Sequence, residues 1–416
     1  MDYFNYKKGV LHAEDVDVNV LAKKYKTPLY VYSRRTMTEH FKKIKNAFSD
    51  IDPLICYSVK ANSALSVMNV LKKEGAGFDI VSGGELFRAL EIGADPGKIV
   101  YAGVGKTKKE IEYAVKSKIL MFNVESKNEL KMINETGKRL KKKIDVALRV
   151  NPDVDALTHE YITTGKKENK FGIDLILAKS LFTAGKRYKH VNIIGVDMHI
   201  GSQITTFQPY VDAVSRVTKF IDDIRRQGVD IRYLNIGGGM GIIYDDEKPA
   251  TADIFAKAVK PYISGADVKL ILEPGRFIMG NAGILVSTVT YNKKGIKKNF
   301  LIADAGMNDL IRPSLYQAYH KIIPVNAKRG KLEYYDVVGP ICESGDFLGK
   351  SRHLPAIEEG SLIAVRSAGA YASSMASNYN SRPRAAEVMV KGSRAVLIKE
   401  RETYEDLIRR EKKANI

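Results

Sequence analysis

Between residues 35 and 280 the chain alternates short apolar, β-branched runs with charged stretches that have the period of a helix. We expect eight strands there, at residues 54–59, 77–81, 98–101, 119–123, 144–150, 193–198, 231–236 and 269–272. Amphipathic helices are expected between them, for example at residues 63–74, 83–92, 107–117 and 209–227. Eight strands that each lead into a helix or loop over ~250 residues are typical of a (β/α)8 barrel. An open doubly wound sheet is the alternative, but no Gly-x-Gly-x-x-Gly turn opens a first helix.

Beyond residue 280 the pattern changes to strand-like stretches without regular helices between them. These stretches lie at residues 283–291, 300–303, 362–365, 387–390 and 395–399. They indicate a second, mainly-β domain, and a strand expected at residues 29–32 could complete it. We therefore predict an α/β protein with a TIM-like barrel over residues 35–280. A β-sandwich or β-barrel-like domain is expected to combine residues 1–34 and 281–416.

Composition narrows the class of protein. No apolar run approaches the ~20 residues that cross a bilayer, and the polar N-terminus does not resemble a signal peptide, so we expect a cytoplasmic protein without a membrane partner. The two cysteines, Cys56 and Cys342, are too few for a disulfide framework, and the histidines lack metal-ligand spacing, so no metal site is expected. The formal charge of +19 could attract nucleic acid or small anions. Because the basic residues are dispersed without interleaved aromatic residues, we predict no nucleic-acid partner.

In a barrel, functional residues lie at the carboxyl ends of the strands. Those ends carry Lys60, Asp79 with Ser82, His199 with Ser202, the three glycines 237–239, and the segment 273–276. Lys60 closes the apolar run 54–59, and a lysine at the mouth of a buried strand is expected to be poorly solvated. Poor solvation disfavours the ammonium form and allows a lysine to form a Schiff base with an aldehyde. For a lysine taken alone, a side chain that merely extends to water is the alternative.

Glycine turns follow the seventh and eighth expected strands. Gly237, Gly238 and Gly239 follow residues 231–236, and Gly275 with Arg276 follows residues 269–272. Glycine allows backbone N–H groups to approach an anion closely, and barrels often bind phosphate in these two loops. A plain tight turn would explain the triple glycine alone. Two such turns in succession predict a phosphate site.

Glu273 and His199 have both a structural and a functional interpretation. Glu273 could be a structural partner of Arg276, or it could keep a pyridine nitrogen protonated. His199 could be a satisfied interior histidine, or it could lie flat against a cofactor ring. A lysine amine, a phosphate loop, a ring-facing histidine and a carboxylate together describe a pyridoxal 5′-phosphate site.

Six ordered motifs carry a family resemblance. They are YSVKAN, GFDIVSGGE, HIGSQ, GGGMG, EPGR and CESGD. These motifs resemble those of the fold-type III pyridoxal-phosphate decarboxylases, and the resemblance extends from residues 27–32 to residues 383–384. Within that family the chain is most similar to the branch that decarboxylates meso-2,6-diaminopimelate to L-lysine and CO2, the last step of lysine biosynthesis. Ser58 stands where alanine is more frequent in the family, and a serine there should not affect the chemistry.

The resemblance implies roles at the cofactor. It implies covalent attachment of pyridoxal phosphate to Lys60, a ring stacked on His199, and Glu273 at the pyridine nitrogen. The residues implied to support the cofactor or hold its phosphate are Asp79, Ser82, Ser202, Gly237, Gly238, Gly239, Gly275, Arg276 and Tyr371.

The resemblance also implies a homodimer with active sites at the subunit interface, to which the other subunit contributes Cys342 and Glu343. Cys342 is expected to reprotonate the α-carbon of the substrate, although an inert buried thiol is the usual state of a free cysteine. Cys56 is expected to be a core residue.

Substrate choice is expected to depend on arginine, because a planar guanidinium binds a carboxylate through two hydrogen bonds. The resemblance places Arg312 and Tyr316 in a substrate-binding pattern, with Arg276 as a second carboxylate contact. It places Glu343 at the distal ammonium of the substrate, and Tyr371 beside the substrate. Without the family, Arg312 before a proline would be read as a surface arginine.

Three alternatives stay open. The first is a decarboxylase for another basic amino acid or for carboxynorspermidine. The second is an alanine-racemase-like enzyme, which would lack CESGD and would carry an arginine in place of Glu273. The third is a pyridoxal-phosphate-binding barrel protein without enzymatic activity, which would not need a β domain with Cys342 and Tyr371.

Overall fold

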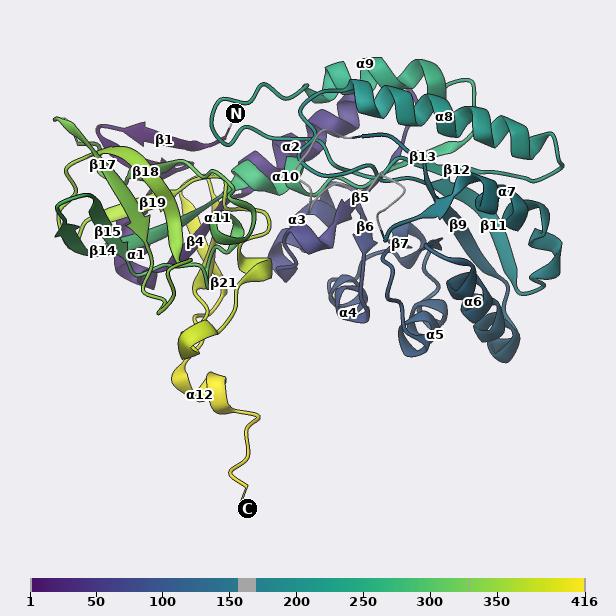
Figure 1. Ribbon diagram of the computed structural model, residues 1–416. Helices are drawn as coiled ribbons and strands as arrows, with labels where there is room; N and C mark the ends of the chain where they lie inside the picture. The colour runs from purple at the N-terminus through teal and green to yellow at the C-terminus, as the bar shows by residue number, and fades with distance from the viewer. Residues whose placement is uncertain (1, 156–169, 329, 415–416) are drawn as a thin grey trace. The chain divides into compact units, whose positions relative to one another are not determined.

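The computed structural model describes residues 2–155, 170–328 and 330–414 (Figure 1). The chain divides into two compact units, which we describe separately. The barrel unit comprises His40–Ile242 and Lys248–Phe277. The β unit comprises Met1–Glu39, Ile243–Glu247 and Ile278–Ile416.

The barrel unit is built on eight parallel strands that close into a ring. In chain order they are β5 (Leu54–Ser58), β6 (Gly77–Ile80), β7 (Ile99–Tyr101), β8 (Met121–Val124), β9 (Ile144–Asn151), β11 (Val191–Asp197), β12 (Tyr233–Asn235) and β13 (Lys269–Leu272). Each strand pairs with the next, and β13 pairs with β5 to complete the ring. The short β10 (Ile173–Asp174) extends β9 as an extra parallel pair. Every expected strand range overlaps one of the eight, so the predicted barrel is confirmed.

Helices follow the strands on the outside of the barrel (Figure 1). They are α3 (Leu65–Lys73), α4 (Gly83–Glu91), α5 (Lys108–Ser117), α6 (Lys127–Leu140), α7 (Leu175–Thr183), α8 (Gln208–Arg225) and α9 (Ala252–Ile263), and α2 (Arg34–Ala47) precedes β5. Four of them begin at a hydroxyl side chain that accepts a hydrogen bond from an N–H of the first turn, at Ser82, Thr107, Ser126 and Thr251. Such caps stabilise a helix by about 1 kcal/mol each and fix where it begins. The strand ends therefore lead into helices at defined positions.

The barrel interior is apolar where β5, β7, β8, β9 and β13 face one another. Its buried cluster contains Cys56, Val100, Met121, Ala147 and Ile271. Burial raises the pKa of the Cys56 thiol well above its usual value, so this cysteine is an unreactive core residue, as predicted.

The β unit contains a large sheet in the order β18–β17–β15–β14–β4–β20–β21, with β19 pairing with both β14 and β16. The bounds are β4 (Leu29–Ser33), β14 (Gly283–Lys294), β15 (Asn299–Ala303), β16 (Ile322–Pro324), β17 (Leu332–Val338), β18 (Phe347–Pro355), β19 (Leu362–Val365), β20 (Ala386–Lys391) and β21 (Arg394–Lys399). A smaller sheet joins β1 (Phe4–Lys7), β2 (Val10–Ala13) and β3 (Val16–Asp17). The helices of this unit in the described residues are α1 (Val18–Tyr25), α11 (Arg312–Tyr316) and α12 (Tyr404–Ile408), and α10 (Arg276–Met279) lies where the chain passes into it from the barrel unit.

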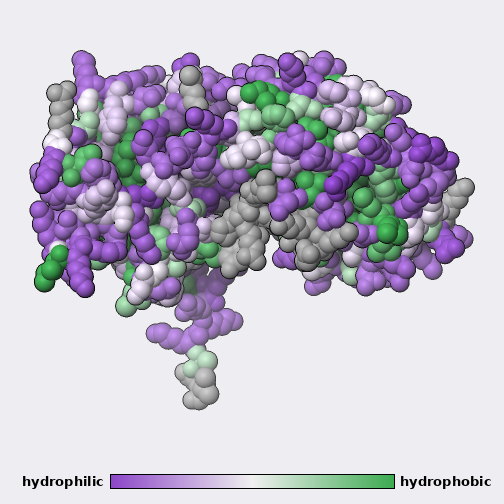
Figure 2. Space-filling view, turned by 45° about the horizontal axis from the view of Figure 1, so that its top comes forward, coloured by the Kyte–Doolittle hydropathy of each residue, from purple (hydrophilic) through white to green (hydrophobic). Residues whose placement is uncertain are grey.

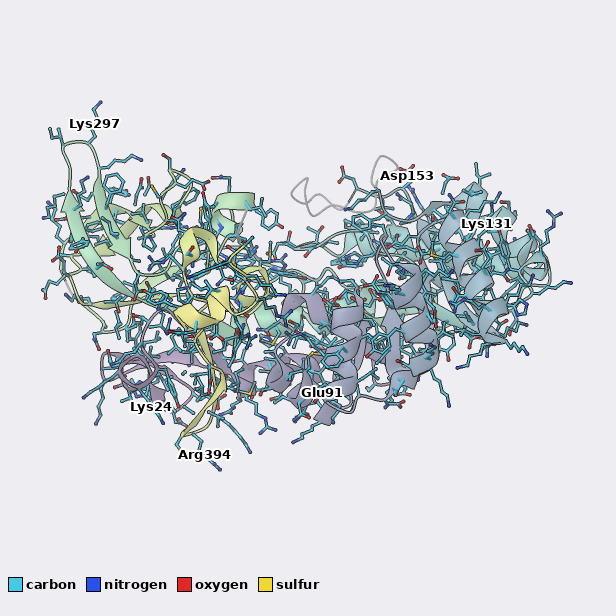
Figure 3. The ribbon with its side chains drawn as sticks, turned by 90° about the horizontal axis from the view of Figure 1, so that it is seen from below. Lys24, Glu91, Lys131, Asp153, Lys297 and Arg394 are labelled. Atoms are coloured by element: carbon cyan, nitrogen blue, oxygen red, sulfur yellow. The ribbon has the colours of Figure 1, made fainter. Side chains whose placement is uncertain are left out.

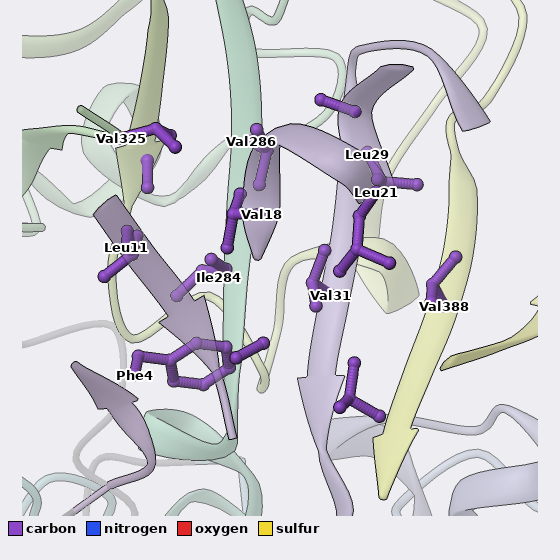
Figure 4. Close-up of a cluster of buried hydrophobic side chains, with 14 of the residues drawn as sticks. Phe4, Leu11, Val18, Leu21, Leu29, Val31, Ile284, Val286, Val325 and Val388 are labelled. Carbon is purple, nitrogen blue, oxygen red and sulfur yellow. The ribbon is translucent and has the colours of Figure 1, made fainter. Parts of the chain in front are cut away.

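The N-terminal strand β4 lies inside this sheet, antiparallel to β14 and parallel to β20. Its side chains Leu29 and Val31 pack with Ile284, Val286 and Val388 in one buried cluster (Figure 4). Burying side chains of this size stabilises the fold by roughly 1.5–3 kcal/mol each. The predicted mainly-β region completed by the N-terminal segment is therefore confirmed.

Basic residues are spread over both units rather than gathered in one place. In the β unit, Lys24, Lys297 and Arg394 extend outward from α1, from the β14–β15 turn and from the start of β21 (Figure 3). In the barrel unit, Lys131 extends from α6 (Figure 3). The visible surface is mainly hydrophilic, with small scattered apolar areas (Figure 2). None of the helices in the described part of the chain has the length and apolar character needed to cross a membrane.

Candidate active site

Lys60 lies in a short 3-10 turn directly after β5, in the barrel unit. Its Nζ donates a hydrogen bond to Asp79 Oδ2, at 2.7 Å, and the Ser58 hydroxyl donates to the same oxygen. Asp79, at the end of β6, is fully buried, whereas the Lys60 side chain is 40% exposed. The expected poor solvation of Lys60 is wrong, because the residue lies two positions beyond the end of β5 and its side chain reaches solvent. The structure instead gives its ammonium a buried carboxylate partner.

Glu273 directly follows β13 and is held by two side-chain amides. The side chains of Asn123 and Asn235 donate to Glu273 Oε1 at 3.1 and 2.5 Å. Burial, and after it the charges of Asp79 and Asp197, raise the pKa of Glu273 well above its usual value. A carboxyl group in this setting favours either its own proton or a cationic partner.

Two other acidic side chains near Glu273, Asp79 and Asp197, are also buried. Burial raises the pKa of Asp197 to about 7, and Asp197 lies 3.9 Å from Arg149. The buried Oδ1 atoms of Asp79 and Asp197 have no hydrogen-bond partner among the described residues. A bound group that brings positive charge and N–H donors would relieve this cluster, and the pyridinium ring of pyridoxal phosphate is such a group.

His199 follows β11 with its ring against the glycine loop. Its Nδ1 accepts a hydrogen bond from Gly238 N–H at 3.3 Å. Burial, followed by the charges of Arg149 and Lys60, lowers the pKa of His199 well below its usual value. The imidazole is therefore neutral at physiological pH, and a neutral ring can lie against an aromatic cofactor without adding charge.

The glycines after β12 are required by close packing. An added Cβ at Gly238 would lie 2.1 Å from the Glu273 carbonyl oxygen, and one at Gly237 would lie 2.5 Å from His199 Nδ1. At Gly239, where φ is +101°, it would lie 2.3 Å from the Gly201 carbonyl oxygen. No side chain fits at these positions, so the backbone itself forms this surface beside His199 and Glu273.

A buried guanidinium that follows β13 contacts a hydroxyl in the segment after β11. Arg276 is 6% exposed and donates from Nε and Nη2 to Ser202 Oγ, at 3.3 and 3.0 Å. Gly275 lies buried between β13 and Arg276. Ser82 accepts from Glu85 N–H as the cap of α4, so its side chain serves the helix. An arginine, a serine and a glycine backbone are the donor set that phosphate requires, so the residues fit the cofactor.

The β unit positions the predicted substrate residues. Arg312 begins α11 and is 5% exposed, with Nη1 at 2.7 Å from His320 Nε2 and its guanidinium 4.7 Å from the centre of the Tyr244 ring. The interpretation of Arg312 as a surface arginine is therefore wrong. Tyr316, at the end of the same helix, is half-buried.

The CESGD segment is joined to the segment that carries Arg312. Asp346 accepts hydrogen bonds from Met307 N–H at 2.6 Å and from Ile341 N–H at 2.7 Å, and Ser314 donates to the Gly345 carbonyl at 2.6 Å. One carboxylate thus binds the backbone of both segments, so the two are positioned together.

Cys342, in that segment, is exposed, and its N–H donates to Asn380 Oδ1. The interpretation as an inert buried thiol is wrong. Glu343 accepts from the Tyr379 hydroxyl at 2.7 Å. Tyr371 is half-buried with a φ of +56°.

Several residues of the site were not predicted from the sequence. Asn123 and Asn235 lie near the ends of β8 and β12, and a reading of every strand end for polar residues would have found them. His320 and Tyr244 gave no such signal, because their contacts with Arg312 depend on the folded β unit.

Comparison with known proteins gives the family. A family model described as the pyridoxal binding domain of pyridoxal-dependent decarboxylases matches residues 34–280. The diaminopimelate decarboxylase of Vibrio cholerae is 49% identical over 409 residues, which cover 98% of each chain. That of Aquifex aeolicus is 49% identical over 408 residues, covering 98% of this chain and 96% of the relative.

Solved structures agree with these relatives. The structure of diaminopimelate decarboxylase from Helicobacter pylori complexed with L-lysine has a TM-score of 0.92 at 42% identity, covering 94% of this chain and 98% of that chain. The M. jannaschii enzyme in complex with L-lysine has a TM-score of 0.94 at 37% identity, covering 99% and 98%. The chain therefore belongs to the diaminopimelate decarboxylase family of pyridoxal-dependent decarboxylases.

Proposed function

We propose that this protein decarboxylates meso-2,6-diaminopimelate to L-lysine and CO2 with pyridoxal phosphate as cofactor, the last step of lysine biosynthesis. The observation that carries this function is the full-length similarity to diaminopimelate decarboxylases. The barrel supports it, because one set of strand ends combines an amine, a phosphate-type donor set and a buried carboxyl group.

The barrel residues are proposed to hold the cofactor at both ends. Lys60 attaches it covalently, Asp79 balances the charge of the lysine, and His199 lies against the ring. Ser202, Arg276 and the glycines Gly237, Gly238, Gly239 and Gly275 bind its phosphate. When bound, pyridoxal phosphate supplies an electron sink for the electrons that the departing carboxylate leaves behind.

Glu273 is proposed to keep the pyridine nitrogen protonated. Both amides that hold Glu273 donate to Oε1, so Oε2 is the oxygen left to accept from the ring N–H. A cationic ring also offsets the cost of ionising this buried carboxyl group. The electron sink is effective only while that nitrogen keeps its proton.

Cys342 is proposed to return a proton to the α-carbon after CO2 leaves. Its exposure permits this role, because the thiol can be reached from outside the β unit. We further propose a cytoplasmic homodimer in which each subunit contributes Cys342 and Glu343 to its partner's site, with Tyr371 beside cofactor and substrate. We propose neither a nucleic-acid nor a membrane partner.

The substrate's distal amino acid centre is proposed to bind through Arg312 and Tyr316, with Glu343 at the distal ammonium and Arg276 as a second carboxylate contact. Replacement Arg312→Ala removes the guanidinium. We expect KM for meso-diaminopimelate to rise by at least about tenfold, since a charge-assisted hydrogen bond contributes roughly 1.5–3 kcal/mol. Initial-rate kinetics measure this, with Arg312→Lys as the control that keeps the charge but loses the planar fork. An unchanged KM in the alanine variant would place the carboxylate contact elsewhere.

Substrate identity is tested by CO2 release. The purified protein with pyridoxal phosphate is assayed in parallel on meso-diaminopimelate, L,L-diaminopimelate, ornithine, arginine and carboxynorspermidine. We expect meso-diaminopimelate to give the highest kcat/KM of the panel. Preference for ornithine, arginine or carboxynorspermidine would assign the protein to another decarboxylase activity, and racemisation without CO2 would reject a decarboxylase altogether.

A further inference from the structure

Arg312 is held in the β unit by aromatic and imidazole groups. His320 Nε2 lies 2.7 Å from its Nη1, and the Tyr244 ring lies beneath its guanidinium. The rings of Tyr244 and His320 meet edge to face, with centroids 5.1 Å apart at 75°. His320 is fully buried. The Arg312 guanidinium therefore contacts two side chains, Tyr244 and His320, whose rings also pack against each other.

The hydrogen bonds of His320 determine its protonation state. Its Nδ1 lies 2.8 Å from the Arg366 carbonyl oxygen, which can only accept, so Nδ1 carries a hydrogen. The guanidinium of Arg312 can only donate, so Nε2 must be the acceptor. Both contacts are satisfied by the neutral imidazole with its hydrogen on Nδ1.

The carbonyl that anchors His320 is itself fixed. Arg366 follows β19, and its N–H donates to the Lys321 carbonyl oxygen at 2.8 Å. Its side chain pairs with Asp2 at 2.6 Å. His320 thus connects Arg312 to the end of a paired strand, so the position of the guanidinium is set by the sheet.

Because the His320 imidazole is neutral, it orients Arg312 without cancelling the positive charge of the guanidinium. A carboxylate at the position of His320 would orient Arg312 and also neutralise it. The imidazole accepts one N–H and brings no negative charge of its own to the guanidinium. A neutral acceptor suits a carboxylate-binding arginine in a buried position, because the acceptor does not compete electrostatically with the ligand.

We propose that His320 is the positioning residue that orients Arg312 toward the carboxylate of the substrate's distal amino acid centre. This inference rests on the proposed function and deepens it. L-lysine keeps that amino acid centre after the opposite carboxylate has left. Binding of L-lysine therefore reports on Arg312 separately from the chemical step.

Two substitutions separate the two hydrogen bonds of His320. In His320→Asn the amide nitrogen takes the place of Nδ1 and can still donate to the Arg366 carbonyl, but the shorter side chain no longer accepts from Arg312. In His320→Gln the longer side chain can place its oxygen near Nε2 and accept from Arg312, while the Arg366 carbonyl loses its donor. The asparagine variant therefore keeps the hydrogen bond to the Arg366 carbonyl and loses the one to Arg312, whereas the glutamine variant does the reverse.

The experiment measures the dissociation constant of L-lysine by calorimetry on the holoenzyme, together with kcat and KM for meso-diaminopimelate. We expect His320→Asn to raise both the dissociation constant and KM by about tenfold, with kcat within about threefold of wild type. His320→Gln should recover most of the lost affinity. An asparagine variant that binds L-lysine like the wild type, or a glutamine variant as weak as the asparagine variant, overturns the proposal.

A double-mutant cycle tests that His320 acts through Arg312. In an Arg312→Gln background, His320→Asn should change L-lysine binding by less than about twofold, because residues in one chain of contacts do not add. An additive loss would mean that His320 acts on its own and would overturn the proposal. The wild-type protein is the reference for the proposed function: if it fails to bind L-lysine and to decarboxylate meso-diaminopimelate, the function fails, whereas failure in the variants alone rejects only the role of His320.

Discussion

Replacement Lys60→Ala is expected to abolish decarboxylation, lowering kcat by ~10³-fold or more, because covalent attachment needs an amine. The position of Lys60 in the fold suits it to this role, in addition to its having an amine. It lies at the mouth of the barrel, its Nζ is 2.7 Å from the buried Asp79 carboxylate, and its side chain is still 40% exposed. A reactant can therefore reach an amine whose position is fixed.

The measurement combines kinetics with mass spectrometry. Borohydride reduction of the wild-type holoenzyme should leave the cofactor on the peptide that contains Lys60, and the Lys60→Ala protein should carry none. Lys131→Ala, on the outer helix α6, is the matched control and should leave kcat unchanged. A cofactor found on another lysine, or activity that persists in Lys60→Ala, would overturn the assignment.

Replacement Glu273→Gln is expected to lower kcat by about 10²-fold, the size that a misplaced proton typically costs. Glutamine keeps an oxygen for the amides of Asn123 and Asn235. It places an NH2 group where the carboxylate would accept from the ring N–H. The substitution thus preserves the packing and removes only the acceptor.

The same substitution should stabilise the cofactor-free protein. Because the pKa of Glu273 is raised, the folded state keeps this proton at pH values where the unfolded chain has lost it. The folded state therefore loses stability as pH rises from the ordinary carboxyl range toward the raised pKa. Glutamine has no such proton, so its advantage in melting temperature should grow with pH.

Glu91→Gln, on the outer helix α4, is the matched control and should change neither kcat nor the pH dependence of melting. Full activity in Glu273→Gln would show that another group holds the ring proton. A melting temperature that falls below wild type at every pH would mean that Glu273 is structural.

The barrel could be predicted because its strands are buried on both faces. Such strands read as continuous apolar runs, and β5, β9 and β13 lay within a few residues of their expected positions. The strands β17 and β18 were not predicted, because they carry exposed charged and polar residues between short buried stretches. An irregular pattern of that kind does not separate a strand from a loop.

The positions of candidate site residues in the fold could be predicted where residue type and chain position coincide. Lys60, His199 and Glu273 all follow barrel strands, so their residue types could be read at known places. The solvation of Lys60 and the burial of Arg312 could not be predicted, since each depends on where neighbouring segments pack. His320 was missed for the same reason, because its contacts with Arg312 and with the Arg366 carbonyl form only in the folded β unit.

The most direct measurement is the product balance of the purified holoenzyme on meso-diaminopimelate. CO2 and L-lysine are quantified together as the substrate is consumed. The account predicts one CO2 and one L-lysine for each meso-diaminopimelate lost, with neither product formed by Lys60→Ala. Loss of substrate without CO2, or CO2 without L-lysine, would contradict it.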